Sequence, residues 1–403
     1  MSAESSDQRG MAAIPWRSPA LYLILASSLM GVMGVSLISP ILPEIRAVFG
    51  ISDSQVGLVI TVYTLPGVFL TPFIGLIADR IGRRRVIIPL LFVFGISGAG
   101  IAFANSFNQV LLFRFLQGIG ASALVTLAVT LIGDFYEGTQ RNAIMGVNSS
   151  MIGTGAALYP LIGGVLAGIR WNAPFLFFGI GIVVGLVAVF ALPEPDGREA
   201  SDMRTYLAGL REVTVHPGAL AIFGALFVVF FVFYGAIQTA LPLLLSDEFS
   251  LSSGEIGLTL AMVAAASAVV SSLYGRISEW RSGPELIALG FIAYGVSLLG
   301  VWIAPSPIFV GVSLLAFGIG FGLVMPSIDT TIVAAVPDRL RAGMMGMRTS
   351  VLRSGQTAGP ISFTFLAETA FETPPQGYRL LLVVCGVVIL VLGVGAYPYL
   401  RHT

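Results

Sequence analysis

The chain has 403 residues, of which 56% are hydrophobic and only 10% are charged, so it is too apolar for a soluble globular protein of this size. Its formal net charge is zero, which gives no reason to expect an acidic partner such as nucleic acid. The single cysteine, Cys385, excludes a disulfide framework and a paired thiolate site, and no catalytic motif is present. We therefore expect no metal, no cofactor and no enzyme activity.

Apolar runs of about 20 residues recur along the chain, each long enough to cross a bilayer as a helix. The strands of a membrane barrel alternate polar and apolar residues, which these runs do not, so an all-α integral membrane protein is predicted. Twelve spans are predicted, at 18–41, 54–78, 86–105, 109–133, 142–168, 174–192, 218–246, 255–278, 285–304, 307–336, 342–367 and 378–400. The polar segment 193–217 separates a first six-helix bundle, 1–192, from a second, 218–403.

All basic residues are arginines, and they are distributed unevenly along the chain. With the N-terminus in the cytoplasm, fifteen arginines lie in or beside cytoplasmic segments: Arg9, Arg17, Arg80, Arg83, Arg84, Arg85, Arg141, Arg198, Arg204, Arg211, Arg276, Arg281, Arg339, Arg341 and Arg401. The outer loops hold three: Arg46, Arg170 and Arg379. This positive-inside bias predicts cytoplasmic termini, a cytoplasmic loop at 193–217 and a location in the cell inner or cytoplasmic membrane.

The two halves repeat with an offset of 200 residues. Matched pairs include Gly75 and Gly275, Gly118 and Gly318, Arg141 and Arg341, and Pro160 and Pro360. One register held over about a hundred positions indicates a duplicated six-span unit. Two parallel repeats of this kind put a binding site between the halves, near the bilayer midplane.

The stretch GLIADRIGRRR, residues 75–85, concentrates four arginines where the second span leaves the membrane. One interpretation is a topology anchor, because arginines complement the negative end of a helix dipole. The carboxylate of Asp79 does not fit that field, but it would fit the N-terminus of the eleventh span. A second interpretation is therefore a latch between the halves. Its predicted residues are Gly75, Asp79, Arg80, Gly82 and Arg83, with Arg341 at the start of the eleventh span. The equivalent contact in the other direction is predicted between Glu279 and the fifth span near Arg141.

GLIADRIGRRR resembles the loop signature between spans two and three of the major facilitator superfamily. LLFRFLQGIGAS, residues 111–122, resembles the fourth-span motif of that family, and ISPILPEI fits the end of its first span. GAALYPLIGG, residues 155–164, and WNAPFLF, residues 171–177, resemble motifs of its twelve-span drug:proton antiporter branch. The resemblance covers all twelve spans. It implies the major facilitator fold and alternating access, with a cavity lined mainly by spans 1, 4, 7 and 10.

The chain departs from that branch in two places. Tyr159 replaces the glycine that usually precedes Pro160, and spans one and seven lack the acid that many such antiporters carry. In span seven the sequence offers only Gln238. The residues predicted to let the fifth span and its counterpart bend are Gly155, Pro160, Gly163, Gly164, Gly359 and Pro360.

Four ionisable residues are predicted to lie deep in the membrane: Arg114, Asp329, Arg348 and Arg353. Such residues are costly in lipid and mark a cavity or a paired partner. Either arginine of the eleventh span could reach Asp329, so a structural ion pair and a transport role both stay open. Arg114 has no acid partner in its half, and the resemblance implies that it bonds carbonyls of span one. If Asp329 does not couple protons to transport, the remaining candidates for the coupling group are Asp79, Asp53 and Glu255.

The residues predicted by span and depth to line a cavity are Tyr63, Asn148, Tyr234, Gln238 and Met262; ordinary helix packing is the alternative for each. The predicted function is secondary transport, with proton-coupled efflux of small organic molecules or drugs ahead of proton-linked uptake or facilitated transport of a metabolite. A membrane sensor without net transport is a further alternative. The expected partners are a small organic substrate, protons and the lipid bilayer, and a monomer is expected.

Overall fold

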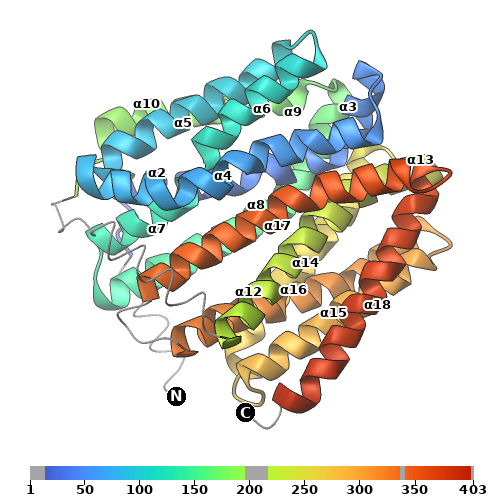
Figure 1. The fold of residues 1–403 in the computed structure, drawn as a ribbon. Coiled ribbons are helices and arrows are strands. Elements are labelled where there is room, and N and C mark those ends of the chain that lie inside the picture. The colour runs from blue at the N-terminus through green and yellow to red at the C-terminus, as the bar shows by residue number, and fades with distance from the viewer. Residues whose placement is uncertain (1–13, 196–216, 336–340, 401–403) are drawn as a thin grey trace.

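The computed structural model describes residues 14–195, 217–335 and 341–400, with the side chains of the eleventh span from Met347 onward. All regular secondary structure in these ranges is helical, as the sequence predicts. In Figure 1 the blue-to-green half of the chain and the yellow-to-red half form two layers of long helices that lie side by side. Most of the predicted loop 193–217 and both chain ends fall outside the described residues.

The first half holds the helices of the first six predicted spans. Its elements are α2 (Pro19–Ser36), the 3-10 turn η1 (Ser39–Ile41), α3 (Leu42–Phe49), α4 (Asp53–Ile81), α5 (Arg83–Gly100), the 3-10 turn η2 (Ile101–Phe103), α6 (Phe107–Ala121), α7 (Leu124–Phe135), α8 (Gly138–Ile169), α9 (Ala173–Phe177) and α10 (Ile180–Ala191). Helix α2 packs on α7 and α8, and α4 and α5 pack on α6. These contacts hold the half together as a helix bundle.

The second half repeats this plan. Its elements are α12 (Pro217–Val232), the π-helical turn η3 (Phe233–Ala240), α13 (Leu241–Phe249), α14 (Ser253–Ile277), α15 (Gly283–Trp302), α16 (Pro307–Ala335), α17 (Arg341–Thr369) and α18 (Pro374–Leu400). Helix α15 packs on α16 and α18, and α12 packs on α17. A π-helical turn inside an α-helix frequently occurs at functional sites, and this one carries the predicted Tyr234 and Gln238.

Eleven segments of the described chain are long and apolar enough to cross a membrane. Helix α17 has 29 residues, which at about 1.5 Å per residue exceeds the ~30 Å bilayer core, and it occupies the place of the predicted eleventh span. The first and seventh spans continue past their predicted ends, to Phe49 and Phe249. Pro43 and Pro242 do not stop them, because each lies in the first turn of a new helix, where proline is tolerated.

The sequence repeat reappears as repeated packing. Ser52 and Ser252 each begin a capping box at the start of α4 and α14, and each side chain accepts from the N–H three residues on. Gly95 and Gly295 are both required by close helix packing. A Cβ there would come within 2.6 Å of Ile182 N in the first case and of Leu390 Cβ in the second. The halves therefore share capping and packing rules.

Two long helix pairs join the halves, α4 with α17 and α8 with α14, and the short helices α3 and α13 also pack on each other. We name the two ends of the molecule after glycines in their loops. The Gly50 end carries Gly50 and Ser250, which follow the first and seventh spans, and the Gly82 end carries Gly82 and Ser278, which follow the second and eighth. The arginine distribution predicts that the Gly82 end is cytoplasmic.

Single cysteines test this orientation in a Cys385→Ala background. Asn105 and Thr373 are exposed at the Gly50 end, and Ser278 is exposed at the Gly82 end. We expect an impermeant thiol reagent, applied to whole cells, to label cysteines at positions 105 and 373 but not at 278, which should label only after permeabilisation. Labelling of position 278 in intact cells would reverse the predicted topology.

Candidate functional site

A buried ion network joins the two halves at the Gly50 end. Arg46, in α3, donates from Nη1 to Asp53 Oδ1 at 2.6 Å, and it also pairs with Asp247 of α13. The hydroxyl of Tyr378, in α18, donates to Asp53 Oδ2 at 2.7 Å. The Asp53 side chain is only 3% exposed, so its charge depends on these partners.

Further polar bonds close the same end. Ser253 of α14 donates to the carboxylate of Glu44 in α3, and the N–H of Ser54 in α4 donates to Glu368 of α17 at 2.7 Å. Ser39 of η1 donates to the backbone carbonyl of Gln238 in η3. Each bond connects one half with the other, so the Gly50 end is a continuous closed contact.

Glycines show that the closure is one-sided. Near the Gly50 end, a Cβ at Gly164 would come within 2.8 Å of Gly254 Cα, and one at Gly257 would press on the Pro160 carbonyl of the opposite half. Toward the Gly82 end of the same helix pair, a Cβ at Gly146, Gly153 or Gly275 would meet no described atom within 4 Å. Helices α8 and α14 therefore make close backbone contact near the Gly50 end, whereas these three positions toward the Gly82 end have open space beside them.

On the α4–α17 pair, polar contacts reach as far as the middle of the helices. The hydroxyl of Thr357 donates to Thr64 Oγ1 at 3.0 Å, and Thr61 donates to the Thr357 carbonyl. Arg353, farther along α17, packs against Gly67 of α4. The halves thus meet from the Gly50 end to mid-depth.

The loop stretch 75–85 is held within the first half. Arg83, which is 8% exposed in its side chain, contacts Asp79 at 2.9 Å and Asp134 of α7 at 3.1 Å. Gly82 has a φ of 107°, which favours glycine, and a Cβ there would meet the carboxylate of Glu194 at 2.6 Å. The arginine therefore joins two helix ends, and the glycine permits the tight turn.

The predicted latch between the halves stays a prediction. Arg341 begins α17, and its side chain and those of the next five residues lie outside the described part of the chain. Arg80 is exposed at the end of α4. Glu279 and Arg141 are also exposed, and they form no ion pair with each other in this arrangement of the described residues. A Cβ at Gly75 would meet no described atom within 4 Å.

Arg114 is fully buried, and each nitrogen of its guanidinium donates a hydrogen bond. Nε donates to Val59 O at 3.0 Å, Nη1 to Gln117 Oε1 at 2.8 Å and Nη2 to Gly34 O at 2.9 Å. The expected bond to a span-one carbonyl is therefore present at Gly34. The guanidinium carbon also lies 4.4 Å from the centre of the Tyr63 ring, so the ring face adds a cation–π contact.

The remaining deep charges separate into a pair and a single residue. Asp329 Oδ1 accepts from Arg348 Nε and Nη2, both at 2.6 Å, so the ion pair predicted between spans ten and eleven forms with Arg348. It is not a buried pair, because the Asp329 side chain is 48% exposed. Arg353 contacts no carboxylate of the described residues and donates to Gln356 Oε1 at 3.2 Å.

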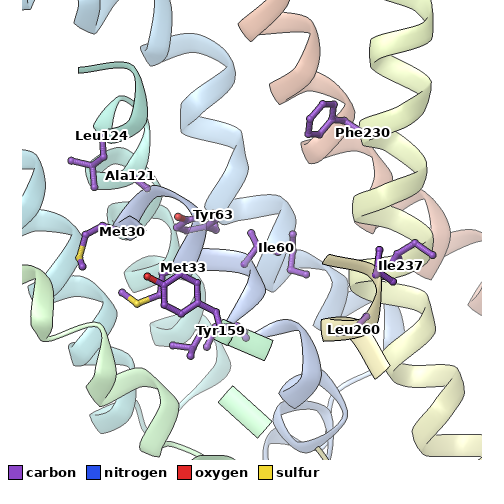
Figure 2. Packing of buried hydrophobic residues seen from close by; sticks show 14 of the residues in the cluster. Met30, Met33, Ile60, Tyr63, Ala121, Leu124, Tyr159, Phe230, Ile237 and Leu260 are labelled. Atoms are coloured by element: carbon purple, nitrogen blue, oxygen red, sulfur yellow. The ribbon is translucent and has the colours of Figure 1, made fainter. Parts of the chain in front are cut away.

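The predicted cavity residues fall into two groups. Tyr63, Asn148 and Gln238 are buried, and the Tyr63 hydroxyl and Asn148 Oδ1 have no hydrogen-bond partner in the described structure. Tyr234 and Met262 are half-buried, and Met262 lies beside Gly311 of α16 within the second half. Figure 2 shows Tyr63 among residues of the first half, including Met33 and Ile60, with Phe230 and Ile237 of the second half farther across.

The predicted bend residues lie inside continuous helices. Pro160 is in the middle of α8, and Pro360 is in the middle of α17. A Cβ at Gly155 would come within 2.8 Å of Leu29 and within 2.9 Å of Tyr159, whereas Gly163, Gly164 and Gly359 lie against backbone atoms of neighbouring helices. These glycines therefore act in this arrangement as sites of close helix approach.

The sequence reasoning missed several partners. Asp134 and Glu194 hold the loop stretch, and Asp247 and Tyr378 complete the closed end. The sequence carries only a weak signal for these partners. Acidic residues lie at the ends of predicted spans, but acids at such positions are also common as ordinary solvent-exposed residues. The sequence indicates Arg46 only as an arginine of an outer loop, and its role emerges once α3 and α13 are brought together.

Two duplicated six-helix bundles that meet along a central interface define the architecture of a membrane transporter rather than an enzyme. The family model of the Major Facilitator Superfamily matches residues 24–280 and 222–403, and the chain belongs to that family. It is similar to the Bacillibactin exporter of Bacillus subtilis (strain 168), with 25% identity over 356 residues that cover 84% of this chain and 87% of that protein.

A second relative is the Multidrug efflux protein YfmO of Bacillus subtilis (strain 168), 26% identical over 379 residues, which cover 93% of each chain. Among solved structures, the fold resembles a bacterial homolog of the human lysosomal transporter Spinster, in an inward-facing and unoccupied conformation. The TM-score is 0.80 at 20% identity, over 96% of this chain and 97% of that chain. At this identity the likeness concerns the fold alone.

Removing the central cation tests the closed end. Arg46→Gln leaves the buried Asp53 carboxylate without its cation, which should weaken the closed contact by about 3 kcal/mol or more. Spin labels at the exposed Val48 and Thr373, on opposite halves, should then show a longer distance component. Arg170→Gln, an exposed arginine at the same end, should leave the distances unchanged. Identical distributions in all three proteins would show that the network does not hold this end shut.

Proposed function

We propose that this protein is a secondary active transporter that works by alternating access and exports small organic molecules in exchange for entering protons. The observation that carries the proposal is similarity over more than four fifths of the chain to two exporters of small molecules. Proton-linked uptake or facilitated transport of a metabolite is the alternative. A transporter of that kind would have the same fold but would move its substrate in the opposite direction or without proton coupling.

The one-sided closure supports alternating access. If the Gly50 end is outside, as the arginine distribution predicts, the arrangement has a closed outer end and loosely packed cytoplasmic helix ends. Gly146, Gly153 and Gly275 then lie on surfaces that have room to approach each other in the opposite state. Export requires that state, because the substrate leaves through the outer end.

A substrate panel tests the function directly. Purified protein in proteoliposomes with an imposed pH gradient should accumulate an exported compound against its gradient, in the direction opposite to proton flow. Uptake in the same direction as protons would favour the alternative. Binding of compounds without any flux under either gradient would favour a sensor, and the exporter proposal would then be wrong.

The loop stretch 75–85 is proposed to latch the cytoplasmic end in the outward-facing state. Asp79 lies at the end of α4, which pairs with α17, and its carboxylate suits the positive N-terminus of that helix. In the present arrangement Arg83 holds Asp79 at 2.9 Å, and Asp134 gives Arg83 a second anion. Loss of Asp79 therefore leaves Arg83 paired.

Asp79→Asn should reduce transport strongly while the protein still inserts and folds. The Asp79 side chain is 27% exposed, so losing its ion pair should change stability by less than about 1 kcal/mol. Spin labels at the exposed Thr139 and Ser278 should lose part of their short-distance population under conditions that favour the outward-facing state. Glu137→Gln is the control at the same end. Full transport with unchanged distances would reduce the stretch to a topology anchor.

Asp329 is proposed as the proton-coupling group. It is the one predicted deep residue that can change protonation, because arginine stays charged. Its carboxylate is paired with Arg348 and still 48% exposed, so a proton can reach it when the pair separates. If the Asp329–Arg348 pair is formed in one state of the carrier and separated in the other, Asp329 would take up and release one proton in each transport cycle.

Asp329→Asn should abolish accumulation driven by a pH gradient but leave downhill exchange of substrate. Since the side chain is about half exposed, the cost in stability should stay below about 1 kcal/mol. Arg348→Gln serves as the matched variant, because it breaks the same pair but keeps the titratable group and should keep a pH response. Equal loss of all activity in both variants would indicate a structural pair, and full pH-driven transport in Asp329→Asn would move coupling elsewhere.

A further inference from the structure

Three arginines lie at depth in this protein, and two of them are electrically satisfied. Arg114 is fully buried with donors on two backbone carbonyls and one amide oxygen. Arg348 is held by Asp329 through two contacts of 2.6 Å. The third charge, that of Arg353, has no such anchor among the described residues.

Arg353 is half-buried in the middle of α17, and the described residues give its guanidinium one weak and neutral partner, Gln356, at 3.2 Å. Desolvating an arginine is costly unless an anion or several acceptors compensate. The guanidinium presents five donors in a planar fork, of which one is used here. The unused donors therefore remain available for a ligand.

This arginine lies at the interface between the halves. A Cβ at Gly67 of α4 would come within 3.1 Å of both Cδ and Nε of Arg353, so the side chain from the second half packs against the first. Helix α17, which carries Arg353, packs on η3, which carries Tyr234. Tyr234 and Arg353 are both half-buried, so part of each residue is uncovered at this interface, whereas the Tyr63 hydroxyl is buried against Gly34 inside the first half.

Aromatic rings continue the surface from Tyr234 into the second half. The ring centre of Phe233 lies 5.6 Å from that of Tyr234 and 5.0 Å from that of Phe321, and Phe230 lies 6.2 Å from Tyr234. Phe233, Tyr234 and Phe321 are half-buried, which leaves part of each ring uncovered. A cation and a phenol next to apolar rings match a ligand with an anionic head and an aromatic body.

We propose that Arg353, with the hydroxyl of Tyr234, forms a subsite for the carboxylate of an amphipathic aryl acid. The inference rests on the transporter function proposed above and adds its substrate class, an organic anion. The guanidinium takes the carboxylate through two parallel N–H bonds, the Tyr234 phenol donates to a remaining lone pair, and the arene packs on Phe233 and Phe321.

Equilibrium binding tests the subsite without requiring transport. Purified protein in phosphatidylcholine nanodiscs, which contain no anionic lipid, is titrated calorimetrically with three pairs of probes that differ in charge. The pairs are phenylacetate and phenethylamine, 4-phenylbutyrate and 4-phenylbutylamine, and 1-naphthaleneacetate and 2-(1-naphthyl)ethylamine. We expect at least one carboxylate to bind, and to bind more tightly than its amine.

The variants separate charge from shape. Arg353→Gln should weaken carboxylate binding about 10- to 100-fold, since hydrogen bonds to charged groups contribute about 1.5–3 kcal/mol. Arg353→Lys should retain part of the affinity, and Arg353→Glu should reverse the preference toward the amine. Tyr234→Phe should weaken binding of the carboxylate by a smaller factor, without lowering the melting temperature of the unliganded protein. Arg170→Gln, an exposed arginine at the Gly50 end, is the control.

Failure of this inference is distinguishable from failure of the proposed function. No carboxylate binding at millimolar concentration, equal binding of acid and amine, or undiminished carboxylate binding in Arg353→Gln would each overturn the subsite. If the subsite is overturned but the protein transports an organic cation, the proposed exporter function still holds. Carboxylate binding that depends on Arg353 but leads to no flux in proteoliposomes would support the subsite and contradict the exporter.

Discussion

The hydrocarbon core of a bilayer offers polar groups no water, and this constraint explains both the fold and the charges of the protein. Backbone groups are satisfied inside helices, so all described regular structure is helical. Buried side-chain charges are satisfied one by one: Arg114 by carbonyls of two other helices, and Asp53 by Arg46 and Tyr378. Against this background a half-buried arginine with one neutral partner among the described residues is an exception that calls for a ligand.

The duplication explains the scaffold but not the closure. Capping boxes begin α4 and α14 at equivalent serines, and glycines at equivalent positions permit equally close helix packing. The closing network breaks the symmetry, because Ser253 stands where Asp53 stands in the first half and bonds Glu44 instead of an arginine. Each half therefore contributes different chemistry to one contact, which orients the two copies with respect to each other.

The contacts between the halves suit reversible separation. At the closed end they combine an ion network, hydroxyl bonds and glycine-mediated approach, whereas α8 and α14 have open space at their other ends. Polar contacts between rigid bundles can exchange for water or for other partners at modest cost when one end opens. The bundle interiors, which are apolar and tightly packed, stay intact through such a change, so motion concentrates at the interface.

The sequence alone determined the membrane class, the helical fold, the duplication, the family resemblance and the candidate deep charges, because those depend on composition, periodicity and spacing along the chain. It also indicated that either Arg348 or Arg353 could reach Asp329. Only the tertiary structure decided that the partner is Arg348, that Asp329 is half exposed, and that Arg353 is left over. It likewise revealed the network of Arg46, Asp247 and Tyr378, whose members come from α3, α13 and α18. Such pairings depend on how helices far apart in the chain are rotated and brought together, and residue spacing within one helix carries no information about that.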